Sequence, residues 1–99
     1  GAVKMSSQFT INEIAIHYGL QNQLVKTMEE TGELQTAIAK FLLASTPEQA
    51  EELKSHVIEE AADCYIMVMQ LRKLLSTYEF DKMVTFKLDR QKKRMEQEQ

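Results

Sequence analysis

The stretch VIEEAADCYIMVMQL, from Val57 to Leu71, is apolar on nearly every side after its first turn, yet it contains the ionisable Asp63. A helix that is apolar all round is normally buried. A lone carboxylate in such surroundings loses much of its hydration energy, so a compensating positive charge is expected beside it. The same segment offers no basic side chain between Lys54 and Arg72. The stretch therefore predicts a central helix whose carboxylate needs a partner from elsewhere.

The composition of the whole chain is typical of a helical globular domain. Its 99 residues are 43% hydrophobic and 27% charged, with three Gly and one Pro, which favours helices over strands. The net charge of −3 argues against general nucleic-acid binding. A single Cys, the lack of a secretory signal and the lack of a bilayer-spanning apolar run indicate a cytoplasmic protein that does not enter membranes.

We expect one domain over residues 1–99, with residues 1–8 flexible (GAVKM being read as a tag remnant) and the tail frayed after about residue 95. Thr10 opens a capping box and Gly19 is a helix stop, while Thr46 and Pro47 begin another helix. The expected helices cover residues 10–18, 21–44, 47–75, with a bend near 55–56, and a final segment that follows a loop, STYEF, at 76–80.

The second expected helix has an apolar stripe at helical spacing, interrupted once by Gln35. Its members are Leu20, Leu24, Met28, Gln35, Ile38 and Leu42. A chain of this length has a limited core of its own, and the third helix needs more cover than three neighbours easily provide. We therefore expect an all-α four-helix bundle whose core is completed by homo-oligomerisation, with helices of two chains sharing it.

Two acidic pairs mark the second and third helices. Glu30 and Glu33 are three residues apart, as are Glu60 and Asp63, so each pair shares a helix face with Cβ atoms roughly 5–6 Å apart. If the two helices pack as an antiparallel hairpin, the pairs can face each other. Such a cluster suits a hard divalent cation, so we predict that these four carboxylates bind Mg²⁺, with Mn²⁺ as an alternative.

The acidic residues also fit roles that need no cation. Glutamates on a helix commonly form a solvated face, and Asp63 alone could be half of a buried ion pair. A di-iron site would need Glu-x-x-His pairs, but His17 and His56 each follow a glutamate by four residues. Both histidines are expected to be surface or capping residues, and Cys64 a small buried hydrophobe. Two acidic pairs on consecutive helices favour the metal site.

The ordered motifs resemble a known family. EETGEL at residues 29–34, followed by EEAAD at 59–63, resembles the EExxE…ExxD signature of the MazG-like all-α nucleoside triphosphate pyrophosphohydrolases. The longer stretches YGLQNQLVKTMEETGELQTAIAK, EEAADCYIMVMQLRKLL and FKLDRQKKRM look like helices of short phage and Gram-positive members, so the resemblance covers about residues 17–95. Gln91 departs from the Asn of many relatives, and the base-stacking Trp of some is missing.

The resemblance implies a Mg²⁺-dependent enzyme that hydrolyses a nucleoside triphosphate to a monophosphate and pyrophosphate, in nucleotide-pool house-cleaning. It implies a dimer or tetramer built from paired hairpins, consistent with the burial argument. It places the metal ligands at Glu30, Glu33, Glu60 and Asp63, with Glu59 and Glu29 as acidic groups that support them.

Catalysis and substrate binding can be assigned to further residues. Either Glu29 or Glu33 is expected to accept a proton from the attacking water or to orient it. Basic groups are expected to hold the phosphates, since a triphosphate brings several negative charges. The expected substrate-binding residues are Gln23, Lys26, Lys87, Arg90 and Arg94, of which the last three share one helix face. That basic face could instead be a solvated helix end.

Two rival functions stay open. A phosphoribosyl-ATP pyrophosphatase of the same fold would share an EAAD-like string, although EETGEL fits the MazG-like group better. A non-catalytic helical oligomer that acts as a binding or regulatory module is the alternative from a different class. Such a module would have no need of a complete acidic set.

Overall fold

The computed structural model describes residues 5–98, which form four helices and no strand. The helices are α1 (Met5–Tyr18), α2 (Leu20–Leu42), α3 (Pro47–Leu75) and α4 (Thr77–Gln97). The all-α class and the number of helices are thus confirmed. Residues 1–4 and 99, which include most of the expected tag remnant, lie outside the described residues.

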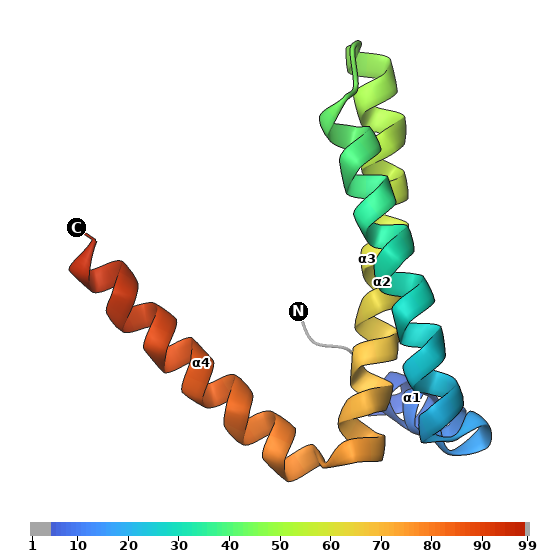
Figure 1. Cartoon of the computed structure of the whole chain (residues 1–99), viewed down its shortest axis with the longest axis vertical. Helices are drawn as coiled ribbons and strands as arrows, with labels where there is room; N and C mark the ends of the chain where they lie inside the picture. The colour runs from blue at the N-terminus through green and yellow to red at the C-terminus, as the bar shows by residue number, and fades with distance from the viewer. Residues whose placement is uncertain (1–4, 99) are drawn as a thin grey trace.

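The helices α2 and α3 lie side by side as a long hairpin, and α1 packs across its lower end (Figure 1). The hairpin turn is closed by the capping box that the sequence predicts. The Thr46 hydroxyl accepts a hydrogen bond from the Gln49 backbone N–H at 3.1 Å, and the Gln49 side chain accepts one from the Ser45 N–H at 2.8 Å. Pro47 occupies the first helical position, where no N–H is needed.

Two helix starts differ from the prediction. The helix α1 begins at Met5 and not at residue 10, so residues 5–8 are helical, and the Gln8 side chain donates to Asn12 one turn later at 3.0 Å. The predicted loop at 76–80 is wrong, because α4 begins at Thr77. The Ser76 hydroxyl caps it by accepting from the Glu79 N–H at 3.1 Å. The helix then continues to Gln97, and α3 is uninterrupted through residues 55–56.

The apolar core of the single chain is small. The buried apolar residues among those described are Ile11, Ala15, Ala37, Cys64 and Met67. The helix α3 is central, since it contacts the other three helices, but only one side of it is buried. Large apolar side chains such as Ile58 and Tyr65 lie exposed on the remainder. The expectation of a fully buried third helix is therefore not met within one chain.

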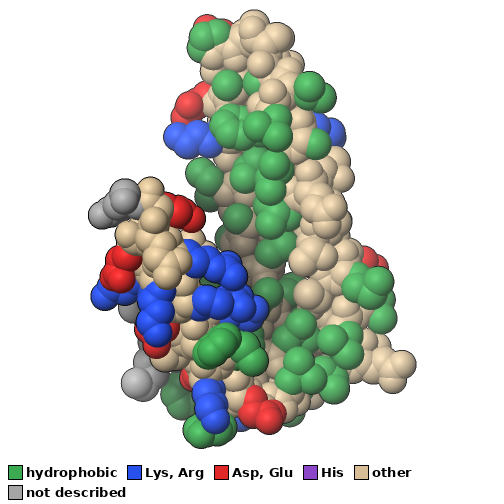
Figure 2. All heavy atoms as spheres, turned by 60° about the vertical axis from the view of Figure 1, so that its left-hand side comes forward, with side chains coloured by type: hydrophobic (Ala, Val, Ile, Leu, Met, Phe, Trp, Pro, Cys, Tyr) green, Lys and Arg blue, Asp and Glu red, His purple; other side chains and the backbone are tan. Residues whose placement is uncertain are grey.

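The apolar stripe of α2 also lies on the surface. The side of α2 that packs against α3 carries Gln23 and Ala37, and each is followed by a member of the stripe about 100° further round the helix. Met28 and Leu42 of the stripe are 74% and 77% exposed. Figure 2 shows hydrophobic side chains in a band along the hairpin, on the side from which α4 projects. The single chain thus leaves a long apolar surface uncovered.

The helix α4 is an arm that diverges from the hairpin (Figure 1). Within the described part of the chain it contacts α3 and neither α1 nor α2, and none of its described residues is buried. The radius of gyration is 16.5 Å, whereas a compact domain of this length has about 13 Å. The chain is accordingly open and V-shaped.

The angle of the arm is fixed at a short elbow. Ser76 is the only residue between α3 and α4. Across it, the Arg72 guanidinium donates to both carboxylate oxygens of Asp81, each at 2.7 Å. These hydrogen bonds lower the pKa of Asp81 from its ordinary value of 3.8. The brace is therefore complete at neutral pH and is lost only as the pH falls through that lowered pKa.

A buried amide pair joins the two helices of the hairpin near α1. The Gln23 side-chain amide donates to the Gln70 carbonyl oxygen at 2.7 Å, and Gln70, only 1% exposed, donates in turn to the Met67 sulfur at 3.5 Å. Gln70 is thus a second polar interruption in the apolar third helix. Burial of an amide is tolerated because its hydrogen bonds are made within the pair.

We predict that Gln70→Leu destabilises the chain by about 1–3 kcal/mol, because it leaves the buried Gln23 amide without its partner. The double variant Gln23→Leu/Gln70→Leu should lose less than the sum of the two single changes. Urea denaturation followed by circular dichroism measures both values. Gln35→Leu, on the surface of α2, is the matched control and should change stability by less than about 0.5 kcal/mol. Strict additivity of the single changes would show that the two amides act independently.

Candidate metal centre

Three carboxylates meet halfway along the hairpin. One ligand oxygen each from Glu30 on α2 and from Glu60 and Asp63 on α3 lie within 4.8 Å of one another. Because Glu60 and Asp63 are three residues apart, α3 presents both on one face, and the packing of α2 against α3 brings Glu30 to them. Glu60 is 7% exposed, Glu30 is half-buried and Asp63 is partly exposed. The cluster could therefore hold a metal ion.

The carboxylates lack the partners that burial requires. Among the described residues, Glu30 Oε2 and Glu60 Oε2 are buried and have no hydrogen-bond donor. The other oxygen of Glu30 lies 3.3 Å from the Lys26 Nζ, which also reaches Glu29 at 3.5 Å. One ammonium shared with an exposed glutamate does not neutralise three clustered carboxylates. Two buried carboxylate oxygens without donors, on two members of one cluster, are an observation that a bound cation would explain.

His56 and Cys64 also lie at the cluster, although neither was predicted to belong to it. The His56 Nε2 is 3.8 Å from Glu60 and its Nδ1 is 3.9 Å from Glu59. The Cys64 thiol, buried as expected, donates to the backbone carbonyl of Glu30 at 3.3 Å and so links the two helices beside the cluster. The sequence does contain a signal that places His56 near the cluster: His56 comes four residues before Glu60 and so lies on the same helix face.

The negative charge of the cluster acts on two neighbouring groups, Cys64 and Lys26. Burial raises the pKa of the Cys64 thiol, and the charges of the nearby carboxylates raise it further. Those carboxylates are Glu30, Glu60, Asp63 and Glu33. The pKa of Lys26 is also raised, first by its hydrogen bonds to Glu30 and Glu29 and then by their charges. Both shifts have the sign that a local excess of negative charge produces.

The remaining acidic candidates surround the cluster. Glu33 is exposed and lies outside the set of three, but it lines the same open depression of about 750 Å³ with Glu29, His56 and Glu60. Glu59 is exposed and paired only with His56. The structure therefore brings together three of the four predicted metal ligands, and the fourth, Glu33, lines a depression that one of them, Glu60, also lines.

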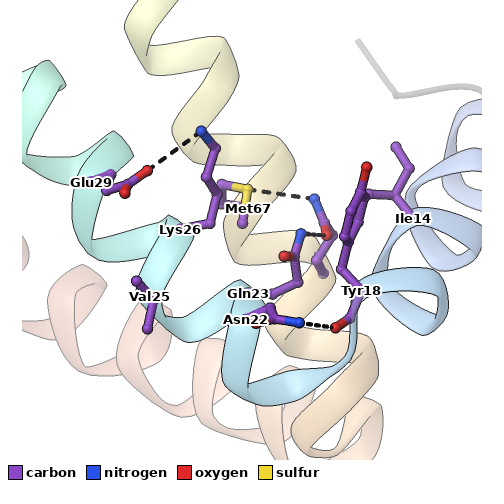
Figure 3. A pocket seen from close by; sticks show the side chains of 9 residues that line it. Ile14, Tyr18, Asn22, Gln23, Val25, Lys26, Glu29 and Met67 are labelled. Carbon is purple, nitrogen blue, oxygen red and sulfur yellow. Dashed lines mark hydrogen bonds and ion pairs between the residues drawn. The ribbon is translucent and has the colours of Figure 1, made fainter.

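A second depression, of about 470 Å³, adjoins the first, and Glu29 lines both. Figure 3 shows the Tyr18 ring on one side of it and the Lys26–Glu29 ion pair on the other. The Gln23–Gln70 amide pair lies between them, so the predicted binding residue Gln23 is buried at the wall of this depression. Hydrogen-bonding amides and an aromatic ring beside a cation are suited to a small polar ligand.

The basic candidates on α4 do not reach the carboxylates of their own chain. Lys87, Arg90 and Arg94 are exposed on the arm, which contacts neither α1 nor α2 within residues 5–98. The Arg90 guanidinium lies over the Phe86 ring of the same helix at 5.7 Å. Of the predicted substrate-binding cations, only Lys26 is at the acidic cluster.

Comparisons with protein-family models, with curated proteins and with solved structures give no match to this chain. None of the helices in the described part of the chain is long and apolar enough to cross a membrane.

We predict that Mg²⁺ or Mn²⁺ raises the melting temperature, because a cation that binds the folded cluster stabilises it by mass action, by about 2.7 kcal/mol at a hundredfold excess over Kd. Asp63→Asn and Glu60→Gln should both reduce this shift. In EDTA, Asp63→Asn should be as stable as the unaltered chain or more so, because it relieves carboxylate repulsion. Differential scanning calorimetry with and without metal measures all three effects.

The matched control is Glu52→Gln, which removes one exposed carboxylate from α3 away from the cluster. It should retain the full metal-dependent shift. If all four proteins respond equally to metal, the stabilisation comes from nonspecific binding and the cluster is not the site. If Asp63→Asn is strongly destabilised in EDTA, Asp63 is instead half of a structural ion pair.

Proposed function

We propose that this chain is a Mg²⁺-dependent nucleoside triphosphate pyrophosphohydrolase. The observation that carries the proposal is the cluster of Glu30, Glu60 and Asp63 with its two orphaned carboxylate oxygens. These residues stand at the acidic positions of the MazG-like signature that the sequence resembles. The same signature includes Glu33 and Glu29, which line the depression next to the cluster.

The donor atoms favour a hard cation. The three ligand atoms that lie together are all carboxylate oxygens, which suit Mg²⁺ and Mn²⁺. Mg²⁺ is usually held by a few carboxylates together with substrate phosphates, and an open depression leaves room for such phosphates. His56 approaches Glu60 only to 3.8 Å, so it serves as a polar neighbour of the ligands.

The residues divide the work of hydrolysis. Glu30, Glu60 and Asp63 would hold the cation, which would offset phosphate charge and make the attacking water more acidic. Glu33 or Glu29 orients the water and accepts its proton as the water oxygen attacks the α-phosphorus. The bond from the α-phosphorus to the bridging oxygen breaks, so pyrophosphate leaves and the monophosphate remains. Lys26 is placed beside the cluster to contact phosphate oxygens.

The adjoining depression suits the nucleoside part of the substrate. Because Glu29 lines both depressions, a triphosphate at the carboxylates would extend its sugar and base towards Tyr18 and Gln23. The Tyr18 ring, about half exposed, offers a stacking surface, and the amide of Asn22 also lines the space. The base-stacking Trp of some relatives is missing from this sequence, and Tyr18 takes its place in this proposal.

We predict that the chain releases pyrophosphate from a nucleoside triphosphate in Mg²⁺ and that EDTA abolishes the release. Asp63→Asn should lower turnover by at least about 100-fold, because it weakens the cation site. One of the two variants Glu33→Gln and Glu29→Gln should lower turnover to a similar extent, and that variant identifies the proton acceptor. A coupled pyrophosphate assay over canonical and damaged NTPs and dNTPs measures this and identifies the preferred base.

The control is Glu51→Gln, an exposed position on the same helix, which should keep its turnover. Circular dichroism must show that each variant is folded. An Asp63→Asn protein that is folded and fully active would refute the ligand assignment. If no nucleotide is cleaved although metal still stabilises the chain, the site binds a cation without this chemistry.

A further inference from the structure

The acidic cluster and the basic arm have complementary charges but are kept apart within one chain. From Lys87 to Arg94, α4 carries five basic side chains and one acidic one. Residues 1–76 carry ten acidic and six basic side chains. Yet α4 contacts only α3 among the described helices, and the Arg72–Asp81 brace and the one-residue linker hold it in that direction. The basic face cannot serve its own cluster without breaking this elbow.

The arm is also an amphipathic helix without cover. Val84, Leu88 and Met95 are exposed and follow one another at helical spacing, beside the face formed by Lys87, Arg90 and Arg94. An isolated helix of 21 residues gains most of its stability from packing an apolar face. The arm is therefore suited to a partner with both apolar and acidic surface.

The hairpin of a second copy has both kinds of surface. Gln23 and Ala37 mark the side of α2 that packs against α3. Round the helix from that side, the apolar stripe lies in one direction, whereas Lys26 and Glu33 lie in the other. The apolar band and the carboxylate cluster are therefore on different sides of the hairpin. The band faces the side from which α4 projects, where Figure 2 also shows Lys and Arg side chains gathered on the arm. A second copy that packs against the apolar band would lie between the hairpin and α4 of the first copy.

We propose that two copies pair through the apolar bands of their hairpins and that α4 of each lies along the acidic flank of the other. Lys87, Arg90 and Arg94 then complete the metal centre of the partner and contact the phosphates there. The arrangement is isologous, so each chain gives its arm and receives one. The part that assigns phosphate contacts rests on the proposed function, whereas the exchange of arms does not.

Several observations converge on this exchange. It covers the exposed stripe of α2, the exposed side of α3 and the apolar face of α4 at once. The described part of their own chain supplies the clustered carboxylates with one ammonium group, that of Lys26, and the exchange adds the basic side chains of a second α4. A short, braced elbow suits an exchanged arm, because the arm must hold its direction before the partner arrives.

Cross-linking of isotope-mixed chains tests the exchange without nucleotide or metal. Equal amounts of unlabelled and ¹⁵N-labelled chains are unfolded together, refolded and treated with a carbodiimide, which joins a lysine amine to a nearby carboxylate. Mass spectrometry then identifies peptides that link Lys87 to Glu29, Glu33 or Glu59. If α4 is exchanged, about half of these cross-links should join one light and one heavy chain, as random pairing into dimers requires.

One control is present in the same sample, and a variant protein provides a second. The pairs Lys26–Glu30 and Lys54–Glu51 lie within one helix, so their cross-links must always be of a single isotope. The variant Lys87→Arg keeps the charge but cannot form the amide, so it should remove the Lys87 cross-link and leave the oligomer intact. Cross-links from α4 to the hairpin that are only of a single isotope would show that the arm folds back on its own chain.

The lack of any cross-link between α4 and the hairpin in a correctly refolded sample would equally overturn the exchange. Light scattering on the same sample should give a mass of at least twice 11.4 kDa, and a monomer would contradict the pairing. None of these readouts depends on turnover. A failure of the arm exchange is therefore distinguishable from a failure of the proposed hydrolysis.

Discussion

The repulsion between the carboxylates of Glu30, Glu60 and Asp63 is the interaction that the rest of the structure must offset. The packing of α2 on α3 holds these carboxylates within 4.8 Å and buries two of their oxygens without donors. Like charges so placed cost stability unless something positive joins them. Lys26 supplies part of that charge. A divalent cation would supply the remainder most directly, and it would also allow phosphates to approach a site lined by acids.

The apolar surface lacks partners just as the carboxylates do. Within one chain the stripe of α2 and much of α3 and α4 lack cover, and the radius of gyration of 16.5 Å reflects an open V. An exchanged arm would cover apolar surface and compensate the carboxylates, because it brings apolar area and positive charge to the same partner. The hairpin would then build the cation site, while the second copy completes its core and its phosphate contacts.

Local sequence signals predicted most helix boundaries and the spacing of the acidic residues, but they did not predict how α4 is oriented relative to the hairpin. The Thr46–Pro47 cap and the Gly19 stop set two helix boundaries, because capping depends on near neighbours. The Ser76 cap of α4 was just as local a signal, but the loop predicted at STYEF overlooks it. The spacing of Glu60 and Asp63 predicted the cluster, since one helix fixes both. No spacing could show that α4 points away from it, because that direction depends on one elbow contact.

Paramagnetic NMR with Mn²⁺ tests the cation site most directly, because line broadening reports distance from the bound ion without requiring catalysis. We expect substoichiometric Mn²⁺ to broaden first the backbone amide signals of Glu30, Glu60, Asp63 and Cys64, and EDTA to restore them. Signals from the exposed acidic turn near Glu51 should persist at that concentration. Equal broadening at all exposed carboxylates, with no preference for the middle of the hairpin, would contradict a cation site built by these three carboxylates.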